Sequence, residues 1–194
     1  MKDEIEDQKQ KAILEAAWTA FATYGFRKTS MDDIARGAGM SRAAVYLHFR
    51  NKEDIFRRLA IYCYDMSIEA VKTALEHDGS ITETLARAFQ AQGDGIVEPM
   101  LTSPHGMELL DASGATASDI IEDGERQLRQ IYAEWLDRQA EAGRIHLSGS
   151  AEGISGTMMA GLKGIKVTAG TYPVYKEQVA LAARLFGDGL TRSN

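Results

Sequence analysis

The chain has 194 residues, of which 44% are hydrophobic and 26% charged, and its formal net charge is −6; this is the composition of a globular protein with a packed core. Its single cysteine, Cys63, excludes an internal disulfide and indicates a reducing compartment. There is no apolar run of about 18 residues to span a membrane, and the polar start MKDEIEDQKQK does not resemble a signal peptide, so we expect a cytoplasmic protein without a membrane partner.

Helical periodicity dominates the start of the chain. Apolar residues between positions 13 and 24 fall on one face of a first helix, which Gly25 ends. Ser30 begins a second helix, because its hydroxyl can cap the free amides while Asp33 occupies the third position of a capping box. Gly39 ends this second helix. Helices this short are unstable alone, so we expect them to pack together.

A third short helix follows the glycine turn and completes the proportions of a helix-turn-helix over residues 31–50. Ser41 can cap this helix, and Val45 and Phe49 share the face that is expected to be buried. In a helix-turn-helix the second helix enters the major groove by its N-terminal end. Arg42 then faces outward, where an arginine can pair bidentately with guanine.

Basic charge is concentrated around this motif. From residue 27 to residue 58 there are eight basic and four acidic side chains, whereas residues 61–194 carry 11 basic and 19 acidic ones. A basic patch on an acidic body is typical of a protein that binds nucleic acid with one end. A solvated charged face is the alternative interpretation of so modest an excess.

The segment ILEAAWTAFATYGFRKTSMDDIARGAGMSRAAVYLHFRNKEDIF, residues 13–56, resembles the N-terminal domain of the TetR family of bacterial transcriptional regulators. The resemblance runs without a gap and implies a DNA-binding domain over residues 8–56 and an effector-binding and dimerisation domain over residues 57–194. It implies an all-α homodimer that binds a palindromic operator and is usually a repressor released by a small molecule. The matching positions are Phe21, Gly25, Thr29, Ile34, Ala35, Gly39, Ser41, Tyr46, His48, Phe49 and Lys52.

Contacts with double-stranded DNA are expected from ten residues. Ser30 and Ser41 mark helix N-termini, where free amides can bind phosphate oxygens. The pair Ala43-Ala44 stands where many relatives carry Gly and Thr, so the resemblance leaves the base preference there open. By their position in the family motif, Arg42, Ala43, Ala44 and Leu47 would face base edges, and Thr29, Tyr46, His48 and Lys52 would hold the DNA backbone.

Helices are also expected through the rest of the chain, where the resemblance extends only to helical layout. Asn51 can cap a long helix with two apolar stripes, one through Ile55 and Tyr62 and the other through Ile61 and Ile68. Two stripes indicate that the helix is buried on both sides. Further helices are expected over residues 80–96, 116–141, 150–170 and 174–190, with a loose Gly- and Pro-rich segment over residues 93–114.

A small, largely apolar effector is expected to bind among these C-terminal helices. The double-striped helix provides apolar surface for a cavity, and the segment 93–114 is the part expected to move and admit the ligand. Packing without a ligand is the alternative role of the methionines. The predicted lining residues are Tyr62, Met66, Phe89, Met107, Trp135 and Met158.

The last two helices are expected to pair with those of a second copy as a four-helix bundle. Glycine weakens a helix by about 1 kcal/mol relative to alanine, and close approach of another helix would compensate for the glycines of the first helix. The second helix carries an apolar face. The predicted interface residues are Gly156, Gly164, Val179, Ala182, Phe186 and Leu190.

Two other classes of protein remain open. His105, Glu108 and Asp111 recur every three residues and could ligate a metal from one helix face in an enzyme, but no second histidine or cysteine stands nearby. There is also no Walker loop, dinucleotide fingerprint or nucleophile elbow, so we expect neither an enzyme nor a cofactor. The second class is an architectural DNA-binding protein without an effector, which a solid core between residues 62 and 160 would favour.

Overall fold

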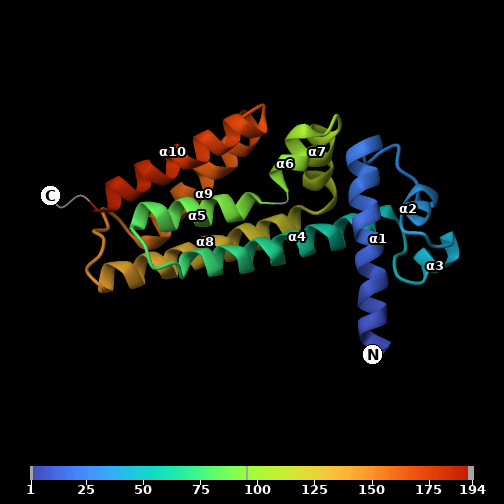
Figure 1. Cartoon of the computed structure of the whole chain (residues 1–194), viewed down its shortest axis with the longest axis horizontal. Helices are drawn as coiled ribbons and strands as arrows, with labels where there is room; N and C mark the ends of the chain where they lie inside the picture. The colour runs from blue at the N-terminus through green and yellow to red at the C-terminus, as the bar shows by residue number, and fades with distance from the viewer. Residues whose placement is uncertain (1, 95, 192–194) are drawn as a thin grey trace. The chain divides into compact units, whose positions relative to one another are not determined.

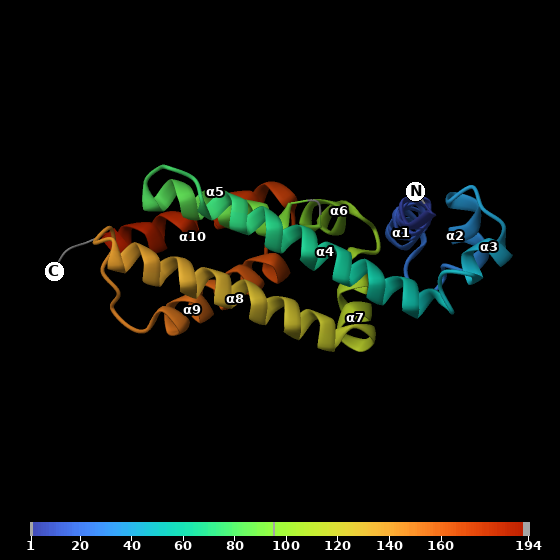
Figure 2. The ribbon, with the colours of Figure 1, turned by 90° about the horizontal axis from the view of Figure 1, so that it is seen from below.

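The computed structural model describes residues 2–94 and 96–191, with the backbone alone for residues 2–7, 107, 110 and 113. Over these residues the chain is all-α, as predicted, and none of its helices is both long and apolar enough to cross a bilayer (Figures 1 and 2). The helices are α1 (Lys2–Tyr24), α2 (Met31–Gly37), α3 (Arg42–Tyr46), α4 (Lys52–Leu75), α5 (Ile81–Gly93), α6 (Val97–Thr102), α7 (Gly106–Thr116), α8 (Ser118–Glu141), α9 (Ala151–Thr168) and α10 (Tyr172–Thr191).

The chain divides into two compact units. Unit 1 runs to Cys63 and also contains Pro99–Ile121, whereas unit 2 contains Tyr64–Glu98 and the residues from Glu122 onward. The chain therefore passes between the units three times, each time within a helix, namely α4, α6 and α8. These units differ from the expected division at residue 57, because the segment 99–121 returns to the N-terminal unit.

Local hydrogen bonds explain where the short helices of unit 1 begin and end. Ser30 Oγ accepts the Asp33 N–H at 3.2 Å and the Asp33 carboxylate accepts the Ser30 N–H at 3.0 Å, which is the predicted capping box at the start of α2. Ser41 caps α3 in the predicted way. Gly25 and Gly39 have φ angles of +84° and +65°, a region that glycine adopts without strain, and they end α1 and the turn after α2.

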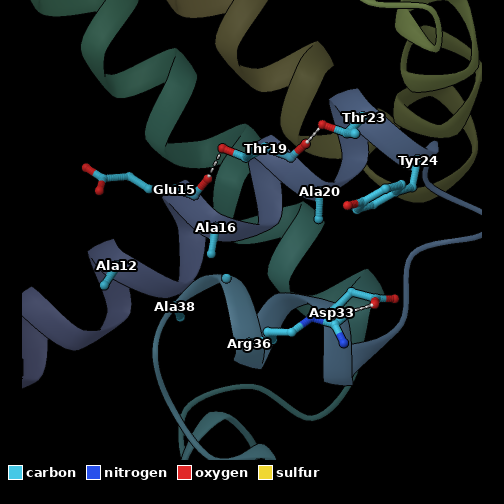
Figure 3. A pocket seen from close by; sticks show the side chains of 11 residues that line it. Ala12, Glu15, Ala16, Thr19, Ala20, Thr23, Tyr24, Asp33, Arg36 and Ala38 are labelled. Carbon is cyan, nitrogen blue, oxygen red and sulfur yellow. Dashed lines mark hydrogen bonds and ion pairs between the residues drawn. The ribbon is translucent and has the colours of Figure 1, made fainter.

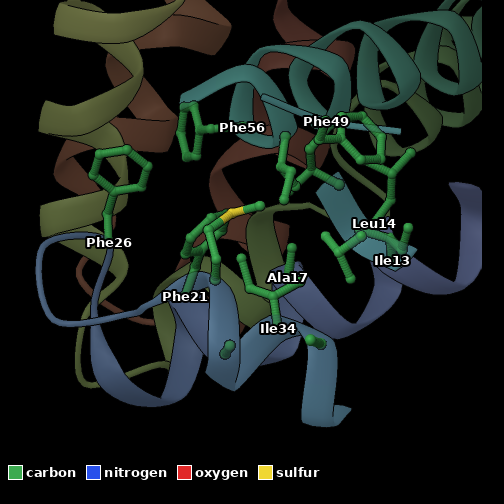
Figure 4. Packing of buried hydrophobic residues seen from close by; sticks show 14 of the residues in the cluster. Ile13, Leu14, Ala17, Phe21, Phe26, Ile34, Phe49 and Phe56 are labelled. Carbon is green, nitrogen blue, oxygen red and sulfur yellow. The ribbon is translucent and has the colours of Figure 1, made fainter. Parts of the chain in front are cut away.

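The core of unit 1 combines aliphatic side chains with an aromatic cluster, and it also buries the residues that anchor α3 (Figure 4). The ring centroids of Phe21, Phe26 and Phe56 lie 5.0–5.7 Å apart in tilted and edge-on pairs, the geometry that aromatic rings prefer. Val45 is fully buried and Phe49 is 5% exposed in the same core. Because Val45 holds one face of α3 inward and Phe49 anchors the segment after it, the opposite face of α3 is left at the surface.

Unit 2 is built from the C-terminal half of α4 with α5, α8, α9 and α10. Figures 1 and 2 show α5 and α10 side by side. Phe89 of α5 meets the edges of Tyr132 at 5.7 Å and Phe186 at 6.2 Å between ring centroids. A Cβ at Gly187 would overlap Thr82 of α5, so glycine allows α10 to pack closely against α5.

The two apolar stripes of α4 are buried in different halves of the helix. In the half that belongs to unit 1, Ile55 and Leu59 are buried, and in the half that belongs to unit 2, Ile68 is buried instead. Tyr62 and Met66, which continue the first stripe, are 41% and 57% exposed. The expectation that α4 is covered on both sides along its length is therefore wrong, because each stripe is covered only in the half belonging to one unit.

The segment predicted to be loose, residues 93–114, contains helix. It carries α6 and most of α7, and α5 ends at Gly93 rather than near Ile96. The break between the last two helices falls at residues 169–171, where Gly170 has φ +70°, two residues earlier than the break expected at residues 171–173. Pro173 lies in the first turn of α10, where its missing N–H costs no helical hydrogen bond.

Candidate nucleic-acid interface

The outward side of α3 and the residue after it form the exposed surface that the sequence predicted. Leu47, directly after α3, is 84% exposed, and Tyr46, its last residue, is 43% exposed. An exposed arginine and leucine beside an anchored helix face provide both polar and apolar contacts for base edges. The exposed residues of the predicted set here are Ser41, Arg42, Ala43, Tyr46 and Leu47, and Ala44 and His48 are half-buried.

Arg42 is held by two neighbouring side chains. Its Nη1 donates to Asp32 Oδ2 of α2 at 3.0 Å, and its Nη2 donates to the Tyr46 hydroxyl at 3.3 Å. The guanidinium carbon also lies 5.4 Å from the centroid of the Tyr46 ring. The hydrogen bond to Tyr46 and the charge of Asp32 raise the pKa of Arg42. Asp32 was not among the predicted site residues, although its place in the first turn of α2 was a signal for proximity to α3.

Ser30 and Ser41 use their hydroxyls to start helices. The Ser30 hydroxyl is engaged with Asp33 within the capping box, and Ser41 Oγ accepts the Ala44 N–H at 3.1 Å. Both residues remain exposed. They therefore set the positions of α2 and α3.

Two residues expected to hold the DNA backbone, Thr29 and Lys52, have hydrogen-bond partners within unit 1. The Lys52 ammonium donates to the carbonyls of Phe26 at 2.8 Å, Arg27 at 2.9 Å and Thr29 at 3.2 Å, which accounts for all three of its N–H donors. Thr29 is 2% exposed and its hydroxyl donates to the Gly25 carbonyl at 2.7 Å. Both side chains therefore stabilise the loop between α1 and α2, and their assignment to phosphate contacts stays a prediction.

The returning segment of unit 1 holds the same loop from another direction. Glu108 of α7 accepts the Arg27 N–H at 2.9 Å, and a Cβ at Gly25 would overlap its carboxylate. Ser103 donates its hydroxyl to the carbonyl of Ala22, near the end of α1. The Arg27 amide is the main cause of a lowered pKa at Glu108. Side chains from residues 99–121 thus fix the end of α1.

An ion pair connects the start of α8 to the N-terminal half of α4 within unit 1. Arg57 donates to both oxygens of Asp119 at 2.7 Å and to the Thr116 carbonyl at 2.9 Å. This bidentate geometry lowers the pKa of Asp119 to about 2 and raises the pKa of Arg57. Such a pair is directional as well as attractive, so it fixes the register of α8 on α4.

The three residues considered as metal ligands have other surroundings. Glu108 binds the Arg27 amide, and its Oε2 lies 3.4 Å from His105 Nδ1, whereas Asp111 is exposed. Within the part of the chain that the structure describes, no group of three or more His, Cys, Asp or Glu side chains is arranged to hold a metal ion.

The predicted effector-binding residues fall into two groups. Phe89, Trp135 and Met158 are at most 2% exposed and belong to unit 2, whereas Tyr62 and Met66 lie at the surface of α4. The side chain predicted at position 107 lies outside the described residues, so Met107 has no assigned surroundings.

The sequence did not predict two polar residues, Tyr132 and Gln92, that lie near the buried Phe89. Tyr132 is fully buried and donates its hydroxyl to Gln92 Oε1 at 3.0 Å, and Gln92 Nε2 lies 3.6 Å from Met159 Sδ. Burial raises the pKa of Tyr132 far above its ordinary value, so the hydroxyl stays protonated and acts as a donor. The signal was present in the sequence, since Gln92 lies three residues after Phe89 on the buried face of α5.

A surface hollow of about 430 Å³ lies between α1 and α2 in unit 1 (Figure 3). Small residues such as Ala16 and Gly37 form its lining. The hydroxyls of Thr19 and Thr23 at its rim donate to carbonyls of α1, and Asp33 is engaged in the α2 cap. Because these polar groups already have partners, they provide no convergent set for a ligand.

The apolar face of α10 predicted for dimerisation lies inside unit 2. Val179, Ala182 and Leu190 are 1%, 9% and 5% exposed, and Phe186 packs edge-on against Phe89. These four residues are therefore corrected to core positions, because the face that carries them packs against α5.

A different face of α9 and α10 is exposed. Leu181 and Leu185 of α10 are 46% and 66% exposed, and Val167 of α9 is 52% exposed. A Cβ at Gly164 would meet nothing within 4 Å, and one at Gly156 would approach only Arg129, at 3.9 Å. Of the two predicted glycines, Gly164 therefore faces open space in the single chain, and Gly156 lies beside Arg129.

Known proteins match this chain by sequence over part of its length, and the family match lies in its N-terminal part. Residues 13–59 match the sequence model for bacterial regulatory proteins of the tetR family. The uncharacterised regulator YfiR of Bacillus subtilis is 39% identical over 74 residues, 38% of this chain and 36% of YfiR. The repressor Rv1474c of Mycobacterium tuberculosis is 38% identical over 137 residues, 69% of this chain and 59% of Rv1474c. The chain thus spans about a third and about three-fifths of these two relatives.

The fold is shared over nearly the whole chain. The structure of SmeT, the repressor of the Stenotrophomonas maltophilia multidrug efflux pump SmeDEF, superposes with a TM-score of 0.72 at 16% identity, covering 95% of this chain and 91% of SmeT. A complex of SmeT with triclosan gives a TM-score of 0.71 at 15% identity, covering 96% and 93%. The likeness to SmeT is one of fold, whereas the sequence match assigns residues 13–59, which carry the exposed α3 surface, to the tetR family of bacterial regulatory proteins.

Proposed function

We propose that this protein is a homodimeric transcriptional repressor that binds a palindromic operator through α3 and is released from it by a small molecule. The observation that carries the proposal is the exposed surface of Arg42, Ala43, Tyr46 and Leu47, set on a helix that Val45 and Phe49 anchor to the core. Because operator DNA lies in the bacterial cytoplasm, the protein is proposed to act there.

The chemistry of this surface suits base recognition in the major groove. Arg42 can donate two hydrogen bonds to guanine O6 and N7, and the methyl group of Ala43 and the side chain of Leu47 can contact thymine methyl groups. Tyr46 and His48 can donate to phosphate oxygens, which position the helix without reading sequence. Recognition of bases and of phosphates thus falls to different side chains.

Selection of bound duplexes from a random DNA pool by the intact protein tests DNA recognition. We expect enrichment of a palindrome whose half-sites are about one helical turn, roughly 34 Å, apart. We expect Arg42→Ala to lose preference at one base pair of each half-site, worth about 1–3 kcal/mol. A pool that remains random after selection by the wild-type protein would refute sequence-specific binding.

A dimer through the exposed face of α9 and α10 supports recognition of a palindrome. Leu181 and Leu185 lie one helical turn apart on α10 and are exposed, Val167 of α9 is exposed as well, and Gly164 leaves room for a helix of a second copy to approach. A two-fold pair of such faces buries apolar surface from both copies. This assignment replaces the face through Val179, which is already buried in the single chain.

The interior of unit 2 supports the effector part of the proposal. Phe89, Trp135 and Met158 are apolar and buried, and the hydrogen bond from Tyr132 to Gln92 provides one polar pair among them. A site with apolar walls and few polar groups is typical for small molecules. The complex of SmeT with triclosan is an example of a family fold with an apolar phenol bound.

For an effector bound in unit 2 to release DNA, its binding must alter the position of the DNA-binding helices in unit 1. The segment 99–121 belongs to unit 1 and is bonded to the end of α1 by Glu108 and Ser103, while α4, α6 and α8 each contain residues of both units. Displacement of these helices by a ligand would therefore be transmitted to the loop that precedes α2. A coupling of about 1–3 kcal/mol gives a 5–150-fold loss of operator affinity.

Titration of small apolar compounds, triclosan among them, against the preformed protein–operator complex tests this mechanism. We expect release of DNA, and an equal weakening of the compound by DNA, since coupling is reciprocal. Trp135→Ala and Gln92→Leu should reduce the response, whereas Met66→Ala, at an exposed position, should retain it. Equal release from the Trp135 and Gln92 variants and from wild type would show that the effector binds elsewhere.

A further inference from the structure

We propose that Asp32 is a specificity-determining residue that positions Arg42 for a base edge and disfavours its use on phosphates. The proposal rests on the proposed DNA-binding function and adds to it an acidic residue on a surface otherwise expected to be basic. Asp32 lies in the first turn of α2, ten residues before Arg42, and the two helices meet through this pair.

The geometry around Arg42 restrains the guanidinium on two sides. Asp32 accepts from Nη1 at 3.0 Å, the Tyr46 hydroxyl accepts from Nη2 at 3.3 Å, and the Tyr46 ring lies under the guanidinium carbon at 5.4 Å. A long exposed side chain ordinarily samples many rotamers, and ordering it at the moment of binding costs affinity. Partners on two helices reduce that cost before DNA arrives.

The restrained arginine still has donors for a base. A guanidinium carries five N–H groups in a fixed plane, and Asp32 and Tyr46 each accept from a different nitrogen of Arg42. Three N–H groups remain, and guanine accepts two hydrogen bonds at O6 and N7. Arg42 can therefore bind guanine without giving up either partner.

The same carboxylate makes phosphate binding by Arg42 less favourable. Binding of random DNA depends on phosphate neutralisation by free positive charges. Asp32 offsets the charge of Arg42, and it is itself 58% exposed, so it would repel a phosphate brought to the same position. Arg36 is less restrained than Arg42. Its partner Asp33 is also bound in the α2 cap, and the Arg36 side chain is 75% exposed.

The test compares two duplexes with the intact protein. One is the sequence that the wild-type protein selects from a random pool, and the other is the random pool itself, both titrated over a range of salt concentrations. Asp32→Asn should bind the random pool about two- to fivefold more tightly, with a salt dependence steeper by about one phosphate contact. It should lower the preference for the selected duplex by about 5- to 150-fold, with the loss at the base pair that Arg42 reads.

Three further variants identify the cause. Asp32→Glu restores the carboxylate and should recover part of the selectivity. Glu15→Gln removes one negative charge from exposed α1 in the same unit without touching Arg42, and should leave selectivity unchanged. In the background of Arg42→Ala, Asp32→Asn should have no further effect on selectivity, since the carboxylate acts through the arginine.

Each other outcome overturns the proposal. Unchanged selectivity in Asp32→Asn, or an equal loss with and without Arg42, would show that Asp32 does not act through Arg42. Thermal unfolding of each variant separates these results from a folding defect, and Asp32→Glu keeps the test valid if Asp32→Asn is unstable. A selective wild type with an unaffected Asp32→Asn variant refutes this inference alone, whereas a wild-type protein that selects no sequence refutes the proposed function as well.

Discussion

Replacement of Leu185 by serine tests the dimer face of α10. This leucine is 66% exposed in the single chain, although its neighbours Ala182 and Leu190 are buried. In the proposed dimer the side chain is covered by the second copy. Serine removes the apolar surface and keeps a small side chain that a helix tolerates at the surface.

The expected magnitude follows from this exposure. Full burial of a leucine side chain stabilises by about 1.5–3 kcal/mol, and two-thirds of that surface remains to be covered by the partner. Since a two-fold interface contains the residue twice, the loss for Leu185→Ser is about 2–4 kcal/mol per dimer, roughly 30- to 700-fold in the dissociation constant.

Sedimentation equilibrium over a range of protein concentrations measures this constant directly. Leu47→Ser is the matched control, because this leucine is even more exposed, at 84%, but lies after α3 in unit 1. It should leave the dimer constant unchanged. Val179→Ser, at a core position of α10, should instead lower the thermal stability of the chain.

Two results would refute the assignment. A dimer constant equal to wild type in Leu185→Ser would exclude this face as the interface. Selective loss of dimer in Val179→Ser, with Leu185→Ser unaffected, would favour the face first predicted from the sequence. A bulky residue at Gly164 provides a second probe of the same face, since Gly164→Leu should also weaken the dimer.

Three predictions concern the stability of unit 1. Lys52→Ala leaves three loop carbonyls without their charged donor and should lower the free energy of unfolding by about 1.5–3 kcal/mol in urea titrations, with Lys52→Met, which retains the apolar stem, showing a similar loss. Phe21→Ala, at a fully buried ring, should cost about 3–5 kcal/mol in the same assay, and a smaller loss than 1 kcal/mol would contradict the described core. The pKa of Asp119 is lowered from 3.8 to about 2 beside Arg57, so its stabilising contribution is present above pH 4 and is lost as the pH falls toward 2; the stability difference between wild type and Asp119→Asn should shrink over that range, and a constant difference would count against the ion pair.

Much of the local structure was predictable because it depends on neighbours in sequence. The capping box at Ser30 and the cap at Ser41 were predicted and are present. The left-handed conformation at Gly25 and Gly39 follows from the same local rules. These interactions span four residues or fewer, so the residue types and their spacing are sufficient to predict them.

The exposed surface of α3 was also predictable. Val45 in the five-residue helix α3 and Phe49, three residues after its end, mark the buried side, so most of the helix faces outward. The hydrogen-bond partners of individual side chains near this surface were not predictable. Lys52 and Thr29 have the residue types of phosphate ligands, but the loop carbonyls and the end of α1 already bind them.

By itself, the sequence determined the all-α class, the helix starts and the face of α3 that is left at the surface, because these follow from periodicity and from hydrogen bonds between near neighbours. Only the tertiary structure decided the partners that lie far apart in the chain. Arg27 and Glu108 are 81 residues apart, and Arg57 and Asp119 are 62 apart. The same holds for α10, where both faces carry apolar residues and periodicity cannot distinguish them. Because α5 packs against the face of α10 that carries Val179 and Phe186, that face is buried, and the face that carries Leu181 and Leu185 remains exposed.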